Sequence, residues 1–548
     1  MKWMNILLSI ISGVFLALAY DYNFLWGLSF VALVPLLYVI YNTSDIKRIY
    51  FLGHLTGFIF LGLSFLWLFS AYPLVWLQTE NNILNFVNIF IVWFLTSLIL
   101  SSAVGLFGVV LNKLKTNKIY DVFLISILWI LFEYLRGWFL FVLSYSSELL
   151  SGSHYTFGLL GYNLANSHYL LQLAGIGGVY LLSFIVVLIN AVLFFIFLSF
   201  IKEGNFLFFC KKIKNSLIKL TNLKTLILVF IIFVFFLLSL NFNVVKTEPL
   251  KTLNIAILQT KFLNWNDKNN QLSKFDKKEV YKKILLDIKN NEPKVDVILF
   301  PESTDFTFDL IETKQNKSFY QNLWPQDEVL IIDSAFVRDW YGDAKSMMYY
   351  YNTQSQNYDI YEKQLLVPTG ETMPYLAKIL LKNLGLSKGN NYFEQYKSYI
   401  KSDQKIPVLG ELQGSKIGIL FCSEIFSPSL FQDLVFQKAE IVGLSASYTT
   451  FRGSPLLLSQ VEKIAKVRAV ENNRYFVQSS NFGHSLVVDN QGKILAKTKE
   501  IGNGYLLYQV KLINKNNLYT YLGNWILWLS FIFSFFSFMG GTHDEWFA

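Results

Sequence analysis

The segment SKIGILFCSEIFS (residues 415–427) indicates the fold of the soluble part of this chain and where its chemistry is expected. Apolar side chains run from Ile417 to Phe421, which predicts a buried strand whose last residues reach the rim of a sheet. Cys422 follows directly, and it is the only cysteine in the part of the chain that we interpret as soluble. A thiol at the end of a buried strand is well placed to act as a nucleophile.

Two charged residues occupy similar positions at the ends of other predicted strands. Glu302 lies in VDVILFPES (295–303), and Lys363 ends QNYDIYEK (356–363). A carboxylate, an ammonium group and a thiol delivered by separate strand ends would supply a base, an electrophilic clamp and a nucleophile. We therefore predict that Glu302, Lys363 and Cys422 form a catalytic site.

The composition places much of the chain in lipid. Of the 548 residues, 53% are hydrophobic and only 16% are charged, which is too apolar for a soluble protein of this size. The formal charge of +9 comes from lysines that gather in short loops between apolar segments, so they indicate membrane topology and not a nucleic-acid partner. Two cysteines, Cys210 and Cys422, do not suggest a disulfide framework.

Eight stretches are long and apolar enough to cross a hydrocarbon core of roughly 30 Å. They are residues 4–20, 24–41, 50–71, 83–111, 119–143, 168–200, 224–242 and 520–540. Lysines and arginines fill the loops after the second, fourth and sixth spans, whereas the other loops among the first seven spans carry acids and no lysine. The positive-inside bias therefore predicts a cytoplasmic N-terminus.

This topology predicts three regions. Residues 1–243 would form a membrane domain of seven helices, residues 244–518 an exported domain, and residues 519–548 a last transmembrane helix with a short tail. The exported region alternates predicted strands with predicted helices, which is typical of an α/β domain, and its length suits two sheets covered by helices.

Glu133 and Arg136 stand out within the fifth predicted span. They lie three residues apart in LFEYLRGWF (131–139), so they share one helix face. Charges inside a membrane are costly and often functional. Two interpretations stay open, contact with a lipid headgroup or an ion pair that fixes helix packing. The loop that follows, residues 145–167, is expected to lie over the outer leaflet.

Several motifs resemble a known family. FPES around Glu302, YEKQLLVPTGE around Lys363 and FCSE around Cys422 resemble the Glu-Lys-Cys signatures of the nitrilase, or carbon–nitrogen hydrolase, superfamily. FEYLRGW (132–138), VPTGETMPY (367–375) and TYLGNW (520–525) resemble the apolipoprotein N-acyltransferase family. This resemblance extends over nearly the whole chain and implies an αββα sandwich for the exported domain.

The resemblance also implies an activity. A phospholipid would donate an acyl chain to Cys422 as a thioester, and the α-amine of the diacylglyceryl-cysteine of an apolipoprotein would accept it. Glu302 would act as the base and Lys363 would stabilise the oxyanion. The family also implies a location in the bacterial inner membrane with the catalytic domain in the periplasm. We expect a monomer that contacts membrane lipid.

Three further positions carry over from the family pattern, and a fourth, at a predicted substrate-binding position, departs from it. Glu371 resembles a second acid beside the lysine, and Glu424 matches the acid two residues after the nucleophile. Trp265 resembles a loop tryptophan near the lipid site, although it is equally an aromatic residue packed on the domain or placed at the membrane surface. Ser423 stands where the family usually has Tyr, and residues 446–453 also depart from the usual pattern, so the acyl-donor preference is open.

Other functions predict different patterns. The five histidines show no paired metal-ligand spacing, and neither HExxH nor a phosphate-binding glycine motif is present, so we expect no metal or nucleotide cofactor. An amidase that uses water as the acceptor would keep the same three residues, but it would need only an anchor and not eight helices. A transporter or receptor would have no evident use for the Glu-Lys-Cys set.

Overall fold

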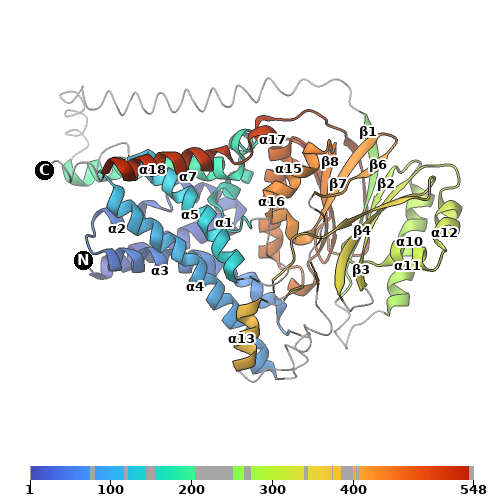
Figure 1. Cartoon of the computed structure of the whole chain (residues 1–548), viewed down its shortest axis with the longest axis horizontal. Helices are drawn as coiled ribbons and strands as arrows, with labels where there is room; N and C mark the ends of the chain where they lie inside the picture. The colour runs from blue at the N-terminus through green and yellow to red at the C-terminus, as the bar shows by residue number, and fades with distance from the viewer. Residues whose placement is uncertain are drawn as a thin grey trace.

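The computed structural model (Figure 1) combines a helical part with a sheet part that lies beside it. The structure describes residues 2–74, 81–116, 121–143, 145, 155–203, 251–263, 273–338, 343–368, 370–372, 374–383, 399–400, 402, 404 and 406–541. The predicted domain boundary between residues 243 and 244 falls outside these residues. The three predicted domain ranges therefore stay predictions.

The helical part consists of apolar helices that precede the strands in the chain, together with two helices after them. They are α1 (Lys2–Asp21), η1 (Asn23–Phe30), α2 (Val34–Tyr41), α3 (Ile46–Ser64), η2 (Leu66–Ala71), α4 (Asn82–Leu114), α5 (Asp121–Leu143), η5 (Leu160–Asn166), α6 (His168–Leu171), α7 (Ala174–Glu203), α17 (Leu518–Leu522) and α18 (Trp525–Gly541). Within the described residues, six helical stretches are long and apolar enough to cross a membrane. They coincide with the first six predicted spans, whereas the predicted span 224–242 lies outside the described residues.

Two predicted spans differ from the structure in their boundaries. The span predicted at 168–200 begins with the separate short helix α6, so its long helix starts only at Ala174. The span predicted at 520–540 is interrupted at Gly523, whose φ of +54° ends α17 before α18 begins. Glycine takes this left-handed conformation without the steric cost that a side chain would add.

Small residues let α3 and α4 pack closely. A Cβ atom at Gly53 would lie 2.8 Å from the carbonyl oxygen of Val104, and one at Gly57 would lie 3.0 Å from the Cβ of Ser101. Apolar burial gives little drive to helix association in lipid, so close backbone approach of this kind is a main source of stability. The sequence therefore supplies glycine where these two helices meet.

In the part of the chain that the structure describes, the strands form one continuous sheet of twelve strands. They are β1 (Thr252–Thr260), β2 (Val297–Leu299), β3 (Leu330–Arg338), β4 (Ala344–Asn352), β5 (Tyr358–Glu362), β6 (Gly410–Leu412), β7 (Ser415–Phe421), β8 (Ile441–Ser447), β9 (Tyr475–Asn481), β10 (Leu486–Val488), β11 (Ile494–Lys497) and β12 (Gly504–Lys511). The order is β5-β4-β3-β2-β1-β9-β8-β7-β6, with β12 on β1 and β10 and β11 beyond β9.

The two halves of this sheet face each other. Strand β1 pairs with β9 only through Gln259 and Thr260, so the sheet is narrow at that point. Away from it, the Tyr350 hydroxyl on β4 donates a hydrogen bond of 3.0 Å to the carbonyl of Ile419 on β7, and Ser445 on β8 reaches the carbonyl of Phe300. The two predicted sheets are therefore halves of one sheet that folds over itself. The short ladder between β1 and β9 joins the two halves.

Helices cover both outer faces of the folded sheet (Figure 1). Helices α10 (Lys274–Asn291), α11 (Phe306–Glu312) and α12 (Asn316–Leu323) lie on the face away from the helical part. Helices α15 (Pro428–Phe436) and α16 (Pro455–Asn472) lie between the sheet and the helical part. The resulting order of layers is helices, sheet half, sheet half, helices, as the αββα prediction requires.

Helix α16 connects the two parts of the molecule. Its Gln460 side chain donates hydrogen bonds to Asp21 Oδ1 at 2.8 Å and to the carbonyl of Ser64 at 2.9 Å. Lys463, one turn later, donates to the carbonyl of Tyr20. These buried polar contacts hold α16 against the ends of α1 and α3, and they fix the β6–β9 half of the sheet relative to the helical part.

Candidate active site

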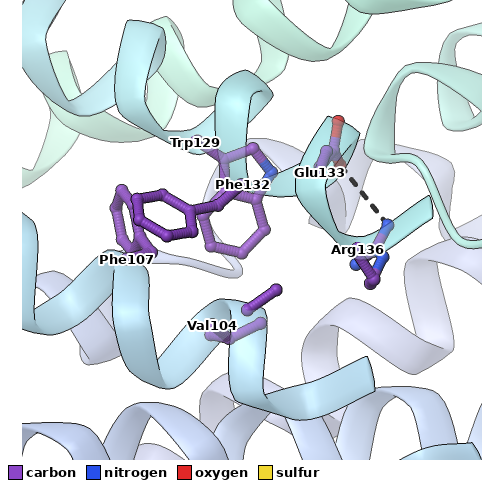
Figure 2. A pocket seen from close by; sticks show the side chains of 7 residues that line it. Val104, Phe107, Trp129, Phe132, Glu133 and Arg136 are labelled. Atoms are coloured by element: carbon purple, nitrogen blue, oxygen red, sulfur yellow. Dashed lines mark ion pairs between the residues drawn. The ribbon is translucent and has the colours of Figure 1, made fainter. Parts of the chain in front are cut away.

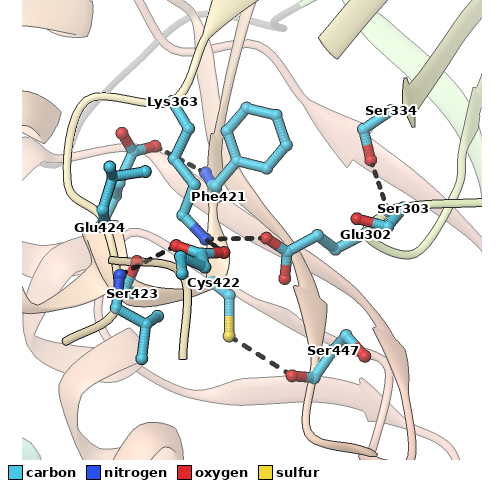
Figure 3. A network of polar contacts seen from close by, with 12 residues as sticks. Glu302, Ser303, Ser334, Lys363, Phe421, Cys422, Ser423, Glu424 and Ser447 are labelled. Atoms are coloured by element: carbon cyan, nitrogen blue, oxygen red, sulfur yellow. Dashed lines mark hydrogen bonds and ion pairs between the residues drawn. The ribbon is translucent and has the colours of Figure 1, made fainter. Parts of the chain in front are cut away.

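The ends of three strands bring the predicted residues together (Figure 3). Glu302 follows β2, Lys363 follows β5, and Cys422 follows β7 and begins the short helix η6 (Cys422–Phe426). The Nζ atom of Lys363 lies 2.9 Å from Glu302 Oε1 and 2.7 Å from Glu371 Oε1. Residues about sixty positions apart in the sequence thus meet at the ends of β2, β5 and β7.

A sharp turn after β2 orients Glu302. The next residue, Ser303, has a φ of +60°, and its N–H donates to Ser334 Oγ at 2.9 Å. Asp305 also has a positive φ of +57°, and its carboxylate accepts the N–H of Phe336 at 3.0 Å. Non-glycine residues with positive φ are strained and persist only where the surroundings hold them. Here strand β3 holds the turn and so directs Glu302 toward Lys363.

Glu424 holds the loop that carries Cys422. Its Oε2 accepts the N–H of Phe421 at 2.7 Å, and its Oε1 accepts the Tyr361 hydroxyl and the Gln364 N–H, each at 2.7 Å. The side chain is completely buried. The Glu424 carboxylate therefore links Phe421, which precedes the thiol, to Tyr361 and Gln364 on either side of Lys363. These contacts are the ones expected of a residue that supports the catalytic loops.

Glu371 places the second carboxylate on Lys363. While Oε1 pairs with the ammonium group, Oε2 accepts the N–H of Val367 at 2.8 Å. This contact brings the Glu371 side chain against the backbone of Val367. Lys363 is thereby held between two acids and has little freedom to move.

Burial sets the charges of the site. It raises the pKa of the Cys422 thiol to about 12, and the Glu302 carboxylate adds to this shift while Lys363 opposes it. Burial likewise raises the pKa of Glu302, against the effect of Lys363. Burial lowers the pKa of Lys363, but Glu302 and Glu371 outweigh this effect and hold the value well above the ordinary one. The resting site therefore contains a protonated thiol beside a charged lysine.

The thiol itself lies against strand β8. Cys422 Sγ is 3.7 Å from the carbonyl oxygen of Ser447, and Cys422 is partly exposed. A protonated thiol with a carboxylate beside it needs that carboxylate to remove its proton at the moment of attack. The geometry suits nucleophilic attack on a carbonyl carbon, with Lys363 near the oxygen that becomes charged.

Two of the predicted substrate-binding positions are Trp265 and Ser423. Trp265 lies outside the described residues, so its role stays a prediction. Ser423 is buried, and its hydroxyl donates a hydrogen bond of 2.5 Å to the carbonyl of Leu365. This contact links the thiol loop to the lysine loop. A role for Ser423 in substrate binding also stays a prediction.

Glu133 and Arg136 lie within α5 and are both buried (Figure 2). Their charged groups are 4.0 Å apart. Arg136 donates to the carbonyls of Phe157 at 3.1 Å and Gly158 at 2.7 Å, and Glu133 accepts the N–H of Leu160 at 2.9 Å. These contacts favour the packing interpretation, in which the pair holds the segment after residue 155 against the helix. Both residues also line a small pocket with Ala103, Val104, Phe107, Trp129 and Phe132.

The segment 155–158 is the main feature that the sequence did not reveal. The position of residues 145–167 over the outer leaflet stays a prediction, and residues 155–158 pack against the catalytic loops. The Tyr155 hydroxyl donates to the carbonyl of Leu366 at 2.6 Å, Thr156 donates to the carbonyl of Phe426, and Phe157 stacks on Phe426 with ring centroids 3.8 Å apart. These partners in the catalytic loops lie more than two hundred residues away, so no local pattern predicts the contacts.

Arg468 on α16 joins the same contact region. It donates to the carbonyl of Ile425 at 3.0 Å and to the Tyr162 hydroxyl at 2.7 Å, and it pairs with Glu471. Glu471 in turn accepts the N–H of Val179 on α7 at 2.8 Å. Tyr361 was also missed, although its position two residues before Lys363 on a strand places it on the same face.

Comparisons with known proteins give a consistent result. Residues 12–192 match the apolipoprotein N-acyltransferase N-terminal domain, and residues 254–514 match the carbon-nitrogen hydrolase family. The chain is 24% identical to the apolipoprotein N-acyltransferase of Haemophilus influenzae over 97% of its own length and 94% of that protein. It is 27% identical to the enzyme of the same name from Rickettsia prowazekii, over 76% of each chain.

The sheet part has relatives of its own. Over 34% of this chain and 65% of the relative, it is 23% identical to the deaminated glutathione amidase of Synechocystis. Among solved structures, Nit3 of Saccharomyces cerevisiae, a member of the nitrilase superfamily, aligns with a TM-score of 0.36 and 16% identity, covering 48% of this chain and 92% of Nit3.

Proposed function

The chain belongs to the apolipoprotein N-acyltransferase family of acyltransferases, and on this premise we propose that it N-acylates apolipoproteins. In this proposal, Cys422 takes a fatty acyl chain from a phospholipid and passes it to the α-amino group of an N-terminal diacylglyceryl-cysteine. The observation that carries the proposal is the position of the thiol. Cys422 lies beside the pair of Lys363 and Glu302, and its loop contacts a segment that packs on the apolar helices.

The first half-reaction forms the thioester. Glu302 removes the proton from Cys422 as the sulfur attacks the ester carbonyl carbon of the phospholipid. Lys363 and a backbone N–H beside the thiol stabilise the oxyanion of the tetrahedral intermediate. The carbon–oxygen ester bond then breaks, the proton on Glu302 passes to the departing alkoxide, and a lysophospholipid leaves.

The second half-reaction uses the same groups with a different acceptor. The amine nitrogen attacks the thioester carbonyl, Glu302 accepts the amine proton, and the carbon–sulfur bond breaks. The thiolate then takes this proton from Glu302, which restores the resting site, and the amide leaves as product. Conversion of a thioester to an amide is energetically downhill, so the reaction requires no nucleotide.

The proposal includes a location. We infer a multi-pass protein of the bacterial inner membrane with its sheet part on the periplasmic side. The lysine-rich loops at the opposite ends of the helices support this orientation. To test it, Lys283→Cys on α10 and Lys113→Cys on α4 are made separately, with both native cysteines replaced by serine. An impermeant maleimide added to cells with a permeabilised outer membrane is expected to label only the first variant.

Product analysis tests the function itself. Purified full-length protein is incubated with a phospholipid and a synthetic diacylated lipopeptide, and the products are measured by mass spectrometry. We expect the triacylated peptide together with lysophospholipid, and neither product from Cys422→Ala. Free fatty acid without acylated peptide would instead support a membrane-anchored amidase-like hydrolase. If Cys422→Ala turned over as fast as the wild type, the activity would come from a contaminant, and the protein itself would be interpreted as a binding protein.

A further inference from the structure

A second pocket lies away from the catalytic loops. Three elements form it, namely the end of η5 with α6, one face of α16, and the turn between β10 and β11. Its volume is about 250 Å³, and it is lined by Ala165, Asn166, His168, Leu171, Lys466, Gln491, Gly492, Lys493 and Ile494. None of the residues placed in the active site lines it.

The turn between β10 and β11 is built to fit against α6. Gly492 has a φ of +80°, and a Cβ atom there would lie 2.4 Å from Leu171 Cδ2. The Gln172 side chain donates to the carbonyl of Gln491 at 2.9 Å, and Asp489 accepts the N–H groups of Gln491 and Lys493. The wall that carries Lys493 is therefore a defined structure and not a loose loop.

The lining of this pocket is cationic. It contains Lys466 and Lys493 together with His168, and it contains no carboxylate among the described residues. The acid nearest to Lys466 along α16 is Glu462, and this carboxylate is paired with Lys497 at 2.5 Å. Within the described part of the chain, neither Lys466 nor Lys493 forms an ion pair. Two lysines thus line one opening. Glu462 favours the charged form of Lys466, but it forms its ion pair with Lys497 and not with either lysine of the pocket.

The pocket lies where the helices leave the apolar region. Helix α6 ends three residues before α7, which is a candidate membrane span. Tyr169 on α6 is 67% exposed, and Phe24 on the neighbouring η1 is 79% exposed. Asn166 donates to Asn23 at 3.5 Å, so these two elements adjoin each other. Exposed aromatic residues at the ends of spans are typical of the boundary between lipid and water.

We propose that this pocket binds the phosphate of an anionic phospholipid headgroup. Lys466 and Lys493 contact the phosphate oxygens, and His168 and Asn166 donate hydrogen bonds at its edge. The acyl chains extend along the exposed apolar surface of η1, which includes Phe24. Basic pockets beside membrane helices bind anionic headgroups in this manner. This site holds a lipid that is not consumed, so the inference does not depend on the proposed acyl transfer.

The test compares variants in lipid nanodiscs. The full-length protein is reconstituted in phosphatidylcholine with a minor fraction of phosphatidylglycerol, released into detergent, and the retained lipids are counted by native mass spectrometry. The test variant is Lys466→Gln/Lys493→Gln. The matched control is Lys283→Gln/Lys317→Gln, which removes two exposed lysines from α10 and α12 on the opposite side of the molecule.

We expect the wild type and the control to retain phosphatidylglycerol, and the test variant to retain about tenfold less, because charge-assisted hydrogen bonds to the phosphate are lost. Retained phosphatidylcholine should be equal in all three proteins. Because Lys493 is exposed, Lys493→Gln alone repeats the test if the double variant does not fold. Equal phosphatidylglycerol in every folded variant would overturn the proposal. Displacement of the lipid by equimolar inorganic phosphate would also overturn it, since that result assigns the pocket to a free anion.

Discussion

The position of Lys363 between two carboxylates is the most informative feature at the scale of single residues. The ammonium group contacts the carboxylates of Glu302 and Glu371 at once, at distances of 2.9 and 2.7 Å. A buried charge of this kind is stable only when it is paired on several sides. The same arrangement leaves a fixed positive charge beside Cys422, where a tetrahedral oxyanion would form.

Replacement of Lys363 is expected to lower the rate of acyl transfer strongly. For Lys363→Met we expect kcat for acyl transfer to fall by about a hundredfold to a thousandfold, the usual effect of removing one oxyanion donor. The matched control is Lys345→Met, which breaks the more exposed pair with Glu362 at 2.9 Å. The control should retain nearly full activity, because such a pair contributes little. Similar losses in both variants would argue against the assigned role.

The pKa of the thiol gives a second prediction at this scale. Because burial and Glu302 raise the pKa of Cys422 to about 12, alkylation by iodoacetamide should accelerate steadily between pH 7 and pH 10 without a plateau. In Glu302→Gln the negative charge is gone, so the thiol pKa falls and alkylation at any given pH becomes faster. Acyl transfer by this variant should nevertheless be lost. A plateau below pH 8 in the wild type would contradict the prediction.

At the scale of elements, Glu424 joins the β7–η6 corner to the loop after β5. Glu424→Gln replaces a carboxylate oxygen that accepts hydrogen bonds with an amide NH2 group that faces other donors. We therefore expect the free energy of unfolding to fall by about 1–3 kcal/mol and kcat to fall as well. Glu411→Gln on the exposed side of β6 is the control and should change neither quantity. The measurement is the thermal unfolding midpoint in detergent together with acyl transfer. Unchanged stability of Glu424→Gln would mean that the corner does not depend on this carboxylate.

Helix α7 provides another test at this scale. Gly178 has a φ of +67° within the helix, and a Cβ atom there would lie 2.4 Å from the Tyr519 ring. Gly178→Ala should destabilise the fold by about 2 kcal/mol or more, because alanine meets both strain and a steric clash. A Cβ at Gly27 has no neighbour within 4 Å, so Gly27→Ala serves as the control. Equal thermal midpoints for the two variants would show that the kink tolerates a side chain.

Much of the element pattern could be predicted from the sequence, because apolar runs and strand ends are local features. Glu302, Lys363 and Cys422 could be selected in this way. Other features could not. Strand β4 was missed although it lies between β3 and β5, and the two predicted sheets are one sheet. The short β1–β9 ladder that joins the halves depends on residues more than two hundred positions apart, and periodicity does not report such pairing.

At the scale of the whole molecule, a chain of polar contacts connects the catalytic loop to the membrane helices. Arg468 binds the carbonyl of Ile425 after the thiol, and Glu471 binds the N–H of Val179 on α7. The pair of Arg468 and Glu471 is fully buried. The thiol therefore keeps a fixed position relative to the helices along which a lipid would arrive.

Removal of one partner from this pair should be costly. Arg468→Met leaves Glu471 buried without its cation, and we expect a destabilisation of about 3–5 kcal/mol. The double variant Arg468→Met/Glu471→Gln should recover part of this loss, because no unpaired charge remains. The check is a comparison of thermal midpoints in detergent. A double variant less stable than the single one would refute the claim that burial of the charge causes the effect.

The central claim is that Cys422 carries the fatty chain, and it is tested most directly by mass spectrometry of the intact protein after incubation with a phospholipid and no acceptor. We predict one added acyl group, mapped by peptide analysis to Cys422, released by hydroxylamine, and transferred to a diacylated lipopeptide when that is added. An unmodified Cys422 under conditions that support turnover, or an acyl group on another residue, would contradict the account.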